Sequence, residues 1–511
     1  MDFLITNAKL VDPLSKKIFP GGVAVVGTRI VEIYNEEPSI PVNHFDRVID
    51  AKGKYLLPGF FDVHSKSDLY SLADPSRINA LSQGILVEVI GQDAFSVAPV
   101  SSKNCLLHTE LSAPSLGNPQ LNWRWESVFQ YLDHLHLKTA SNMLFYSPHG
   151  TMRLECSLNP KLSSTGLSAL AYIFEKSMDD GAIGLSISSH LEPSNIGWDD
   201  DKELSMLLNI LKKKEGVLCV NIERSKKILK DVDKAITLAR TYGLRLHISR
   251  ILPNSVSHVD SMLSIIDKRK KETQGVIVDI SPYTSRLLKL ADLLPKSMRN
   301  ESSEEIRIKF KKSENVKTLL SGLDYNEHEL EALKLVTSSK KDMKKYEGVS
   351  LENISMEKDE TVYDTILGLL TTDFDKVFVE HPVIDSEHLR KIFEYSFVIP
   401  ATTGYREGRY LPDMFSTIPT YFNNYSKGDV SNLISKLSST PAEFYKIKWG
   451  IKKGLKANFI LLDTDSFIGE STYTDPRKLS EGIDLAVVNG KIALEKNKPT
   501  GSRTGEVLSW V

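Results

Sequence analysis

The 511-residue chain is poor in cysteine and has no marked excess of charge of either sign. Cys105, Cys156 and Cys219 are its three cysteines, and none lies in a Cys-x-x-Cys pair. This odd, sparse set argues against a disulfide framework and for a cytoplasmic setting. Lysine and arginine number 64 against 66 aspartate and glutamate, a formal charge of -2. The balance excludes a global positive field that would attract nucleic acid or an anionic membrane.

Long hydrophobic runs are absent as well. No uninterrupted apolar run reaches the ~20 residues that a membrane-spanning helix needs. The start of the chain has neither the basic segment nor the apolar segment of a signal peptide. We therefore expect a cytoplasmic protein without nucleic-acid or membrane partners, and the oligomeric state stays open. A hydrophobic content of 41% suits a globular protein with a substantial core, and the length suits one large domain plus a smaller one.

From residue 58 onward, apolar strands alternate with helical segments. Several of the strands are continuous apolar runs, which is typical of strands buried on both faces. We expect strands at 58–64, 84–91, 141–148, 182–188, 216–223, 245–250, 275–281 and 395–402. Between strands, apolar residues recur at helical spacing, as do Leu204, Leu207, Leu208 and Leu211. This order predicts an α/β fold built on a (β/α)8 TIM-type barrel.

Both ends of the chain have short strands and turns instead. Gly27-Thr28 and Asn489-Gly490 mark hairpin turns between apolar segments. We expect residues 1–57 and 437–511 to join in one small β-sandwich, a composite domain beside a barrel of residues 58–436. An insertion is expected in the barrel at about 286–375, where lysine, glutamate and serine predominate and predict solvated helical faces.

The stretch 58–68, with the sequence PGFFDVHSKSD, places a dense set of polar groups directly after an apolar run. Gly59 permits a close backbone approach, and Phe60 and Phe61 are core material. His64 emerges where a buried strand would open at its carboxyl end. Barrel enzymes have their active sites at that end, so we expect His64 at the barrel mouth.

This stretch resembles the metal-binding signature Pro-Gly-Phe-Ile-Asp-x-His-x-His of the amidohydrolase superfamily. The order and spacing of further motifs resemble the N-acyl-D-amino-acid deacylases (D-aminoacylases) nearly from end to end. The segments that carry the resemblance are 83–84, 91–100, 149–153, 181–186, 247–249, 281–284, 441–442, 454–463, 480–483 and 488–490. The resemblance implies a β-sandwich split around a (β/α)8 barrel.

In that family, zinc assists amide hydrolysis by lowering the pKa of its bound water to about 7. An aspartate at the end of strand eight acts as general base. The resemblance therefore implies a hydrolase acting on C–N amide bonds other than peptide bonds. Matched motif by motif, the family's general-base position is Thr402 here, and its metal positions are His64, Lys66, Asp93, Asn221 and Arg250.

Most of these positions depart from the family pattern. Lys66 replaces the second histidine of the signature, and an ammonium group cannot coordinate a metal. Asp93 stands where the family carries cysteine, and Asn221, a neutral amide, stands where it carries histidine. Arg250 replaces a histidine ligand with a permanent cation that has no lone pair to give. The hydroxyl of Thr402 cannot accept a proton near neutral pH.

The simplest interpretation is that an ion-pair network has replaced the metal centre. Asp93 would then pair with Lys66, and His64 would be a hydrogen-bonded vestige. We expect no bound cofactor on this interpretation, although zinc is the family's cofactor. The alternative is a rebuilt zinc site, which would use His64, Asp93, Glu223 and His190.

Some residues of this chain correspond to the residues that contact the substrate in the family. Tyr283 matches a tyrosine near the substrate, with packing as its alternative role. Arg406 and Arg409 lie in the region from which the family holds the substrate carboxylate, although the local Pro-Arg pattern is absent. A small carboxylate-bearing molecule is therefore the expected partner.

We expect an amidohydrolase-like protein that resembles N-acyl-D-amino-acid deacylases but has a degraded metal site and little or no such activity, a pseudoenzyme. The alternative is an active deacylase-like hydrolase of N-acyl amino acids with a rearranged or metal-free site. Fold alone does not decide between them, because function depends on the site residues.

Overall fold

The computed structural model describes residues 2–11, 17–157, 159, 161–189, 198, 200–222, 227–251, 256–295, 298, 302–310, 313–322, 325–374, 376–406 and 408–508. The chain forms two compact units. The first comprises Met1–Pro282, Glu387–Ser471 and Arg477–Val511, and the second comprises Tyr283–Ser386 and Thr472–Pro476. No helix among the described residues is long and apolar enough to cross a membrane.

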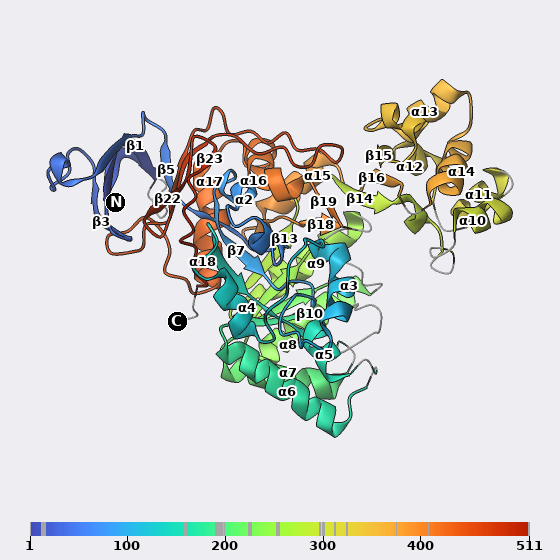
Figure 1. Cartoon of the computed structure of the whole chain (residues 1–511), viewed down its shortest axis with the longest axis horizontal. Helices are drawn as coiled ribbons and strands as arrows, with labels where there is room; N and C mark the ends of the chain where they lie inside the picture. Colours follow the sequence, from blue (N-terminus) through green and yellow to red (C-terminus); the bar gives the residue numbers. More distant parts are fainter. Residues whose placement is uncertain are drawn as a thin grey trace. The chain divides into compact units, whose positions relative to one another are not determined.

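A nine-stranded sheet in the first unit brings both ends of the chain together, as the blue and red strands of Figure 1 show. Its described strands are β1 (Phe3–Val11), β2 (Ile18–Val26), β3 (Arg29–Tyr34), β4 (Arg47–Asp50), β5 (Tyr55–Pro58), β20 (Phe459–Leu462), β21 (Ile483–Val488), β22 (Lys491–Glu495) and β23 (Lys498–Pro499). Antiparallel pairing of β5 with β20 joins the two groups of strands. Phe3, Val23 and Phe459 pack in the core of this β-sandwich domain.

The parallel strands of the first unit form the barrel. They are β6 (Phe60–Asp62), β7 (Ile85–Ile90), β8 (Asn142–Phe145), β9 (Ser147–Pro148), β10 (Gly184–Ser188), β11 (Val217–Asn221), β12 (Arg245–Ser249), β13 (Val276–Ile280) and β17 (Val398–Pro400). The strand expected at 141–148 is split, because β8 pairs with β7 whereas β9 pairs with β10. The predicted (β/α)8 barrel with a β-sandwich domain is confirmed.

Helices follow the barrel strands in the chain. They are α1 (Tyr70–Ala73), α2 (Ile78–Leu81), α3 (Cys105–Leu116), α4 (Val128–Leu135), α5 (His149–Cys156), α6 (Ser164–Asp179), α7 (Asp201–Lys213), α8 (Ile228–Tyr242), α9 (Val256–Arg269), α15 (Ser386–Glu394), α16 (Asp413–Asn424), α17 (Val430–Ile434), a π-helix at Ser435–Ser439 and α18 (Thr440–Phe444). In α7 the leucines that predicted the helix are buried, and Asp200 caps its start by accepting from the backbone of Lys202 and Glu203.

One residue, Gly59, connects the sandwich to the barrel, between β5 and β6. Its N–H donates to the carbonyl of Asn458, and its carbonyl accepts from the indole of Trp449 at 2.8 Å. A Cβ atom here would lie 2.3 Å from the side chain of Leu86. The close approach expected at Gly59 is therefore present, and it sets the direction in which β6 enters the barrel.

The second unit has a core of its own. Its antiparallel sheet contains β14 (Ser285–Lys289), β15 (Lys334–Thr337) and β16 (Phe378–Pro382), and its helices include α10 (Ser303–Lys309), α11 (Ser313–Ser321), α12 (Glu327–Glu331), α13 (Leu351–Lys358) and α14 (Val362–Asp373). Leu335, Ile354, Ile366 and Val379 are buried together. The composition of residues 286–375 predicted an insertion of solvated helices there, whereas this unit also contains a sheet and includes the short stretch 472–476.

Candidate functional site

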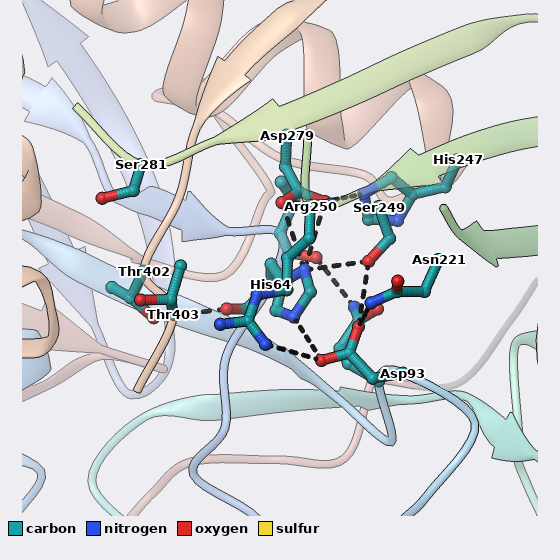
Figure 2. Close-up of polar contacts among 12 residues, drawn as sticks. His64, Asp93, Asn221, His247, Ser249, Arg250, Asp279, Ser281, Thr402 and Thr403 are labelled. Carbon is teal, nitrogen blue, oxygen red and sulfur yellow. Dashed lines mark hydrogen bonds and ion pairs between the residues drawn. The ribbon is translucent and has the colours of Figure 1, made fainter. Parts of the chain in front are cut away.

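The carboxyl ends of neighbouring barrel strands bring a charged cluster together, shown in Figure 2. His64 follows β6, and Asn221 is the last residue of β11. Ser249 is the last residue of β12, lies opposite Asn221 in the parallel register, and is followed by Arg250. Asp279 lies in β13, next to β12. The register of a parallel sheet thus places these five side chains at one end of the barrel.

Asp93, in the loop after β7, is the carboxylate at the centre of this mouth cluster. Its Oδ2 accepts from Nζ of Lys66 at 2.6 Å and from Nη1 of Arg250 at 3.2 Å. Its Oδ1 accepts from Nδ2 of Asn221 and, at 3.4 Å, from Oγ of Ser249. Both carboxylate oxygens are therefore engaged by protein donors.

Electrostatics keep Asp93 charged. Burial alone would favour the neutral acid, but Lys66, His64 and Arg250 outweigh it and hold the pKa of Asp93 well below its usual range. The backbone here is unusual as well, since Asp93 has φ 59 and Arg250 has φ 54. Left-handed conformations of non-glycine residues cost of order ~1 kcal/mol or more and are concentrated at functional sites. The positions of Asp93 and Arg250 in the cluster therefore cost conformational free energy in the backbone.

His64 is a buried imidazole held between two carboxylates. Its Nδ1 lies 3.1 Å and 3.2 Å from the oxygens of Asp279, and its Nε2 lies 3.4 Å from Oδ2 of Asp93. Burial opposes the charged ring, but Asp279 and Asp93 raise the pKa of His64 to about 9. His64 is therefore an imidazolium near neutral pH, and a metal ligand would have to be the neutral form.

Asp279 was missed by the sequence analysis. Oδ2 of Asp279 lies 2.7 Å from Nε2 of His247, whose Nδ1 lies 3.3 Å from the hydroxyls of Tyr146 and Tyr445. Burial would raise the pKa of Asp279, but His64 and His247 lower it instead. A lone aspartate in the apolar run Val-Ile-Val-Asp-Ile of β13 was the signal that could have revealed it.

Thr402, which the motif match predicted at the family's general-base position, follows β17 and contacts a buried acid. Its N–H donates to Oδ1 of Asp62 at 3.1 Å, and its hydroxyl donates to Oδ2 at 2.7 Å. The same hydroxyl lies 3.2 Å from the carbonyl oxygen of His64. Burial raises the pKa of Asp62 to about 6. The hydroxyl thus acts as a donor in this arrangement, and its oxygen is not presented as a base.

A second buried acid at the mouth, Asp413 of α16, was also missed. Its Oδ2 accepts from the hydroxyls of Thr403 and of Ser281, the latter at 3.0 Å. Its Oδ1 has no hydrogen-bond partner among the described residues. Burial raises the pKa of Asp413. No sequence pattern identified Asp413, because it does not directly follow the last barrel strand, which ends at Pro400.

The described donors at the mouth do not fit zinc. Lys66, Arg250 and protonated His64 bring positive charge to the oxygens of Asp93, so a cation there would meet repulsion. Within the described residues, no group of three histidine, cysteine, aspartate or glutamate side chains could hold a metal ion. His190 and Glu223, which the alternative zinc site requires, lie outside the described residues.

The residues expected on the substrate side belong to two different units. Tyr283 belongs to the second unit, where its ring meets that of Tyr473 edge to face with centroids 6.4 Å apart. Arg406 and Arg409 face each other in a short hairpin of β18 (Tyr405–Arg406) and β19 (Arg409–Tyr410). Arg409 is exposed and Arg406 is half-buried. Their roles in holding a substrate stay predictions.

Curated relatives match almost the whole chain. The N-acyl-D-aspartate deacylase of Alcaligenes xylosoxydans xylosoxydans is 25% identical over 526 residues, which is 99% of this chain and 95% of that protein. The D-aminoacylase of the same organism is 21% identical over 529 residues, 99% of this chain and 97% of that protein. No protein-family model matches the chain.

A solved structure gives the same result for the fold. It is the crystal structure of N-acyl-D-glutamate deacylase from Bordetella bronchiseptica, complexed with zinc and a phosphonate inhibitor that mimics the tetrahedral intermediate. It matches with a TM-score of 0.76 at 19% identity, over 100% of this chain and 99% of that one. The resemblance seen in the sequence is confirmed: this chain is a relative of the N-acyl-D-amino-acid deacylases and has the amidohydrolase fold.

Proposed function

We propose that this protein has lost zinc-assisted deacylation and uses its barrel mouth to bind a small carboxylate-bearing molecule. The observation that carries the proposal is the contact of two cations with one carboxylate oxygen. Lys66 at 2.6 Å and Arg250 at 3.2 Å both contact Oδ2 of Asp93. They provide the positive charge that a metal ion provides in a zinc hydrolase, but they provide no Lewis acid and no activated water.

The charges of the mouth cluster support an anionic ligand. Three of its side chains, His64, Lys66 and Arg250, are cationic near neutral pH, and they contact two carboxylates, Asp93 and Asp279. These five groups therefore leave one positive charge in excess. The Arg250 side chain is 11% exposed. A guanidinium at a mouth suits a carboxylate, which it can bind through two parallel hydrogen bonds.

Metal analysis and activity assays test the loss of deacylation. We expect purified protein to contain zinc far below one equivalent per chain, before and after incubation with zinc. We expect no hydrolysis of a panel of N-acyl-D- and N-acyl-L-amino acids. One bound zinc per chain, or turnover of any panel member, would overturn this part of the proposal.

A pair of substitutions adds a variant in which zinc binding is expected to increase. Lys66→His with Arg250→His removes both cations and supplies imidazoles, so we expect this double variant to bind zinc more tightly than the parent. The matched control is Lys138→His with Arg240→His, which changes two exposed cations with side chains 55% and 53% accessible. The control should behave as the parent protein does.

Calorimetry with N-acetyl-D-aspartate tests the binding part. We expect saturable binding that Arg250→Gln weakens by about tenfold or more, because a charge-assisted contact is lost. A neutral diamide of the same compound should bind more weakly. Equal binding of the diamide, or no binding of N-acetyl-D-aspartate, would contradict a carboxylate site.

A metal-free hydrolase is the second candidate function, and one contact favours it. The hydroxyl of Thr402 donates to Oδ2 of Asp62 at 2.7 Å, and burial raises the pKa of Asp62 to about 6. A carboxylate so placed would take the proton of the Thr402 hydroxyl as its oxygen attacks an amide carbonyl, and would return that proton to the amine that leaves when the C–N bond breaks; water would then hydrolyse the acyl ester. This candidate requires turnover that survives chelators and is lost in Thr402→Val, whereas the first candidate requires no turnover in either protein.

We also propose that the protein acts in the cytoplasm. Support comes from the cysteines, since Cys105, Cys156 and Cys219 are all free thiols. Expression with a fluorescent tag and fractionation of the host cell would check the compartment.

A further inference from the structure

A cavity of about 580 Å³ lies within the first unit. Pro58, the last residue of β5, lines it, whereas His64 follows β6 on the other side of Gly59. An extended chain advances ~3.3 Å per residue, so the chain from Pro58 to His64 can span up to roughly 20 Å. None of the described residues that line the cavity belongs to the mouth cluster. The cavity is therefore separate from the proposed carboxylate site.

The walls of this cavity are mainly apolar. Some of the lining residues come from the strands β1, β2 and β3, and others come from the helices between Ile434 and Phe444 and from the loop that follows them. Representative lining residues are Leu10, Phe19, Ile33, Ile434, Ala442 and Trp449. Small-molecule sites typically enclose about 300–1,000 Å³ and are lined mostly by hydrophobic and aromatic side chains. The cavity meets both conditions.

Ser438 is the buried polar group on the cavity wall. It is 1% exposed and belongs to the π-helix Ser435–Ser439. Its hydroxyl forms no hydrogen bond with the residues that the structure describes, and it is not one of their fully enclosed polar atoms without a partner, so the oxygen keeps a little accessible surface. A ligand with one group able to donate or accept would hydrogen-bond to it in place of water.

The charged residues of the cavity set the charge of that ligand. Glu443 and Lys452 both line it, both are exposed, and they have opposite signs. Together they favour neither an anion nor a cation. An apolar ligand with a neutral polar group suits the walls, the Ser438 hydroxyl and this balance of charge.

We propose that this cavity binds a small neutral amphiphile, an apolar chain or ring bearing a single hydroxyl or amide group. The site does not depend on the function proposed for the barrel mouth. Its π-helix fits this role, because single π turns are frequent at functional sites. Ile434, Ser438 and Ala442 follow one another at intervals of four across that turn, and all three line the cavity.

Trp449 provides a local signal for the test, because it is one of the five tryptophans and lies on the cavity wall. The probe is 8-bromo-1-octanol, whose bromine quenches indole fluorescence on contact. We expect saturable quenching that is largely removed in Trp449→Phe. Calorimetry with 1-octanol should show that Trp449→Phe still binds.

Two further variants decide whether the bound alcohol lies in this cavity. Ala442→Phe fills the space and should abolish binding, while Ser438→Ala should weaken binding about fivefold, as expected for loss of one neutral hydrogen bond. Circular dichroism and the melting temperature of each variant show whether it is folded. Because Ser438→Ala removes only one oxygen atom, it keeps the test decisive even where Ala442→Phe fails to fold.

The remaining arms test the charge and the place of the ligand. Octanoate and octylamine should each bind more weakly than 1-octanol, and Arg250→Gln at the mouth should leave octanol binding unchanged. Absence of saturable binding, equal binding by Ser438→Ala, or tighter binding of either charged probe would overturn the proposal.

Discussion

The two ends of the first barrel strand differ in how their polar groups are used. At the carboxyl end, Lys66 and His64 are buried and contact carboxylates of the mouth cluster. Before its amino end, beyond Gly59, Pro58 of β5 borders an apolar cavity, and the hydroxyl of Ser438 on the cavity wall has no hydrogen-bond partner among the described residues. The segment 58–66 therefore joins a cavity with unfilled space to a cluster of charged groups that contact one another.

The mouth cluster provides its buried carboxylates with counter-charges from side chains of the protein itself. A buried carboxylate needs such a counter-charge, and organic cations can supply it. The contacts of Asp93 to Lys66 and Arg250 do this here. Buried charge pairs are costly to break, so the mouth should be sensitive to single substitutions, whereas the cavity wall should tolerate them.

The largest effect is expected from Asp93→Asn. This substitution keeps the shape of the side chain but leaves Lys66, His64 and Arg250 without their shared counter-charge. Loss of one partner from a buried ion pair costs roughly 3–5 kcal/mol, and we expect a decrease of that order in the free energy of unfolding. Chemical denaturation measures it.

Asp133→Asn is the matched control, because Asp133 pairs with Lys138 at the surface and its side chain is 64% accessible. Exposed pairs are worth at most about 1 kcal/mol. Equal destabilisation by the two variants would mean that the mouth cluster is no more than a set of surface pairs.

The second effect is a dependence of stability on pH. The folded pKa of His64 is raised to about 9, above an ordinary value of about 6.5, so the folded state binds its proton more tightly. This contribution is fully present below about pH 6.5 and is lost as pH rises through about 9. Carboxylates whose folded pKa is lowered, such as Asp93, lose their contribution at acidic pH instead.

We therefore expect the free energy of unfolding to fall by roughly 2–3 kcal/mol between pH 6.5 and 9. Denaturation at several pH values checks this. His64→Asn should flatten that part of the curve, and an unchanged slope in the variant would assign the fall to another group.

A smaller loss is expected from Thr402→Val. It removes the hydroxyl donor from Oδ2 of Asp62 while keeping the side-chain shape. A buried acceptor left without its donor costs about 1–3 kcal/mol. Denaturation near pH 8, where Asp62 is ionised, should show the larger part of this loss, and a loss that grows toward pH 4 would contradict it.

The smallest effect is expected from Ser438→Ala without any ligand. Its hydroxyl has no hydrogen bond to lose among the described residues, so stability should change by no more than about 0.5 kcal/mol. The melting temperature measures this. A large loss would show that the hydroxyl is satisfied within the folded protein and would remove the contrast with the mouth.

Several features could be predicted from the sequence because they are local or repetitive. The alternation of apolar strands and helices predicted the (β/α)8 barrel, and the spacing of motifs predicted the relationship to the deacylases. The match to the family motifs predicted Lys66 and Arg250 as cations at metal positions, and the structure places both against Asp93, while the correspondence to metal positions stays a prediction. Asp279 and Asp413 were missed. Asp279 is a single acid in a strand whose sequence pattern indicates only burial, and Asp413 is a single acid at the start of a helix.

The second unit is a larger example of structure that the sequence did not predict. Its composition is rich in lysine and glutamate, which predicted solvated helices. Leu335 and Val379 nevertheless pack in one core although they are far apart in the chain. Composition gives only the numbers of polar and apolar residues, whereas a hydrophobic core depends on which apolar side chains pack together in the folded chain.

The sequence by itself determined the chemical groups available at the mouth, because substitutions at motif positions are visible without coordinates. The sequence also determined the order of strands and helices in the barrel, because the spacing of apolar residues that favours each element extends over only a few residues. Only the tertiary structure decided that Lys66, Arg250, Asn221 and Ser249 all converge on Asp93. It alone produced the cavity between the sandwich and the π-helix. Both depend on distances between segments remote in the chain, which are set by how strands and helices pack and not by local preference.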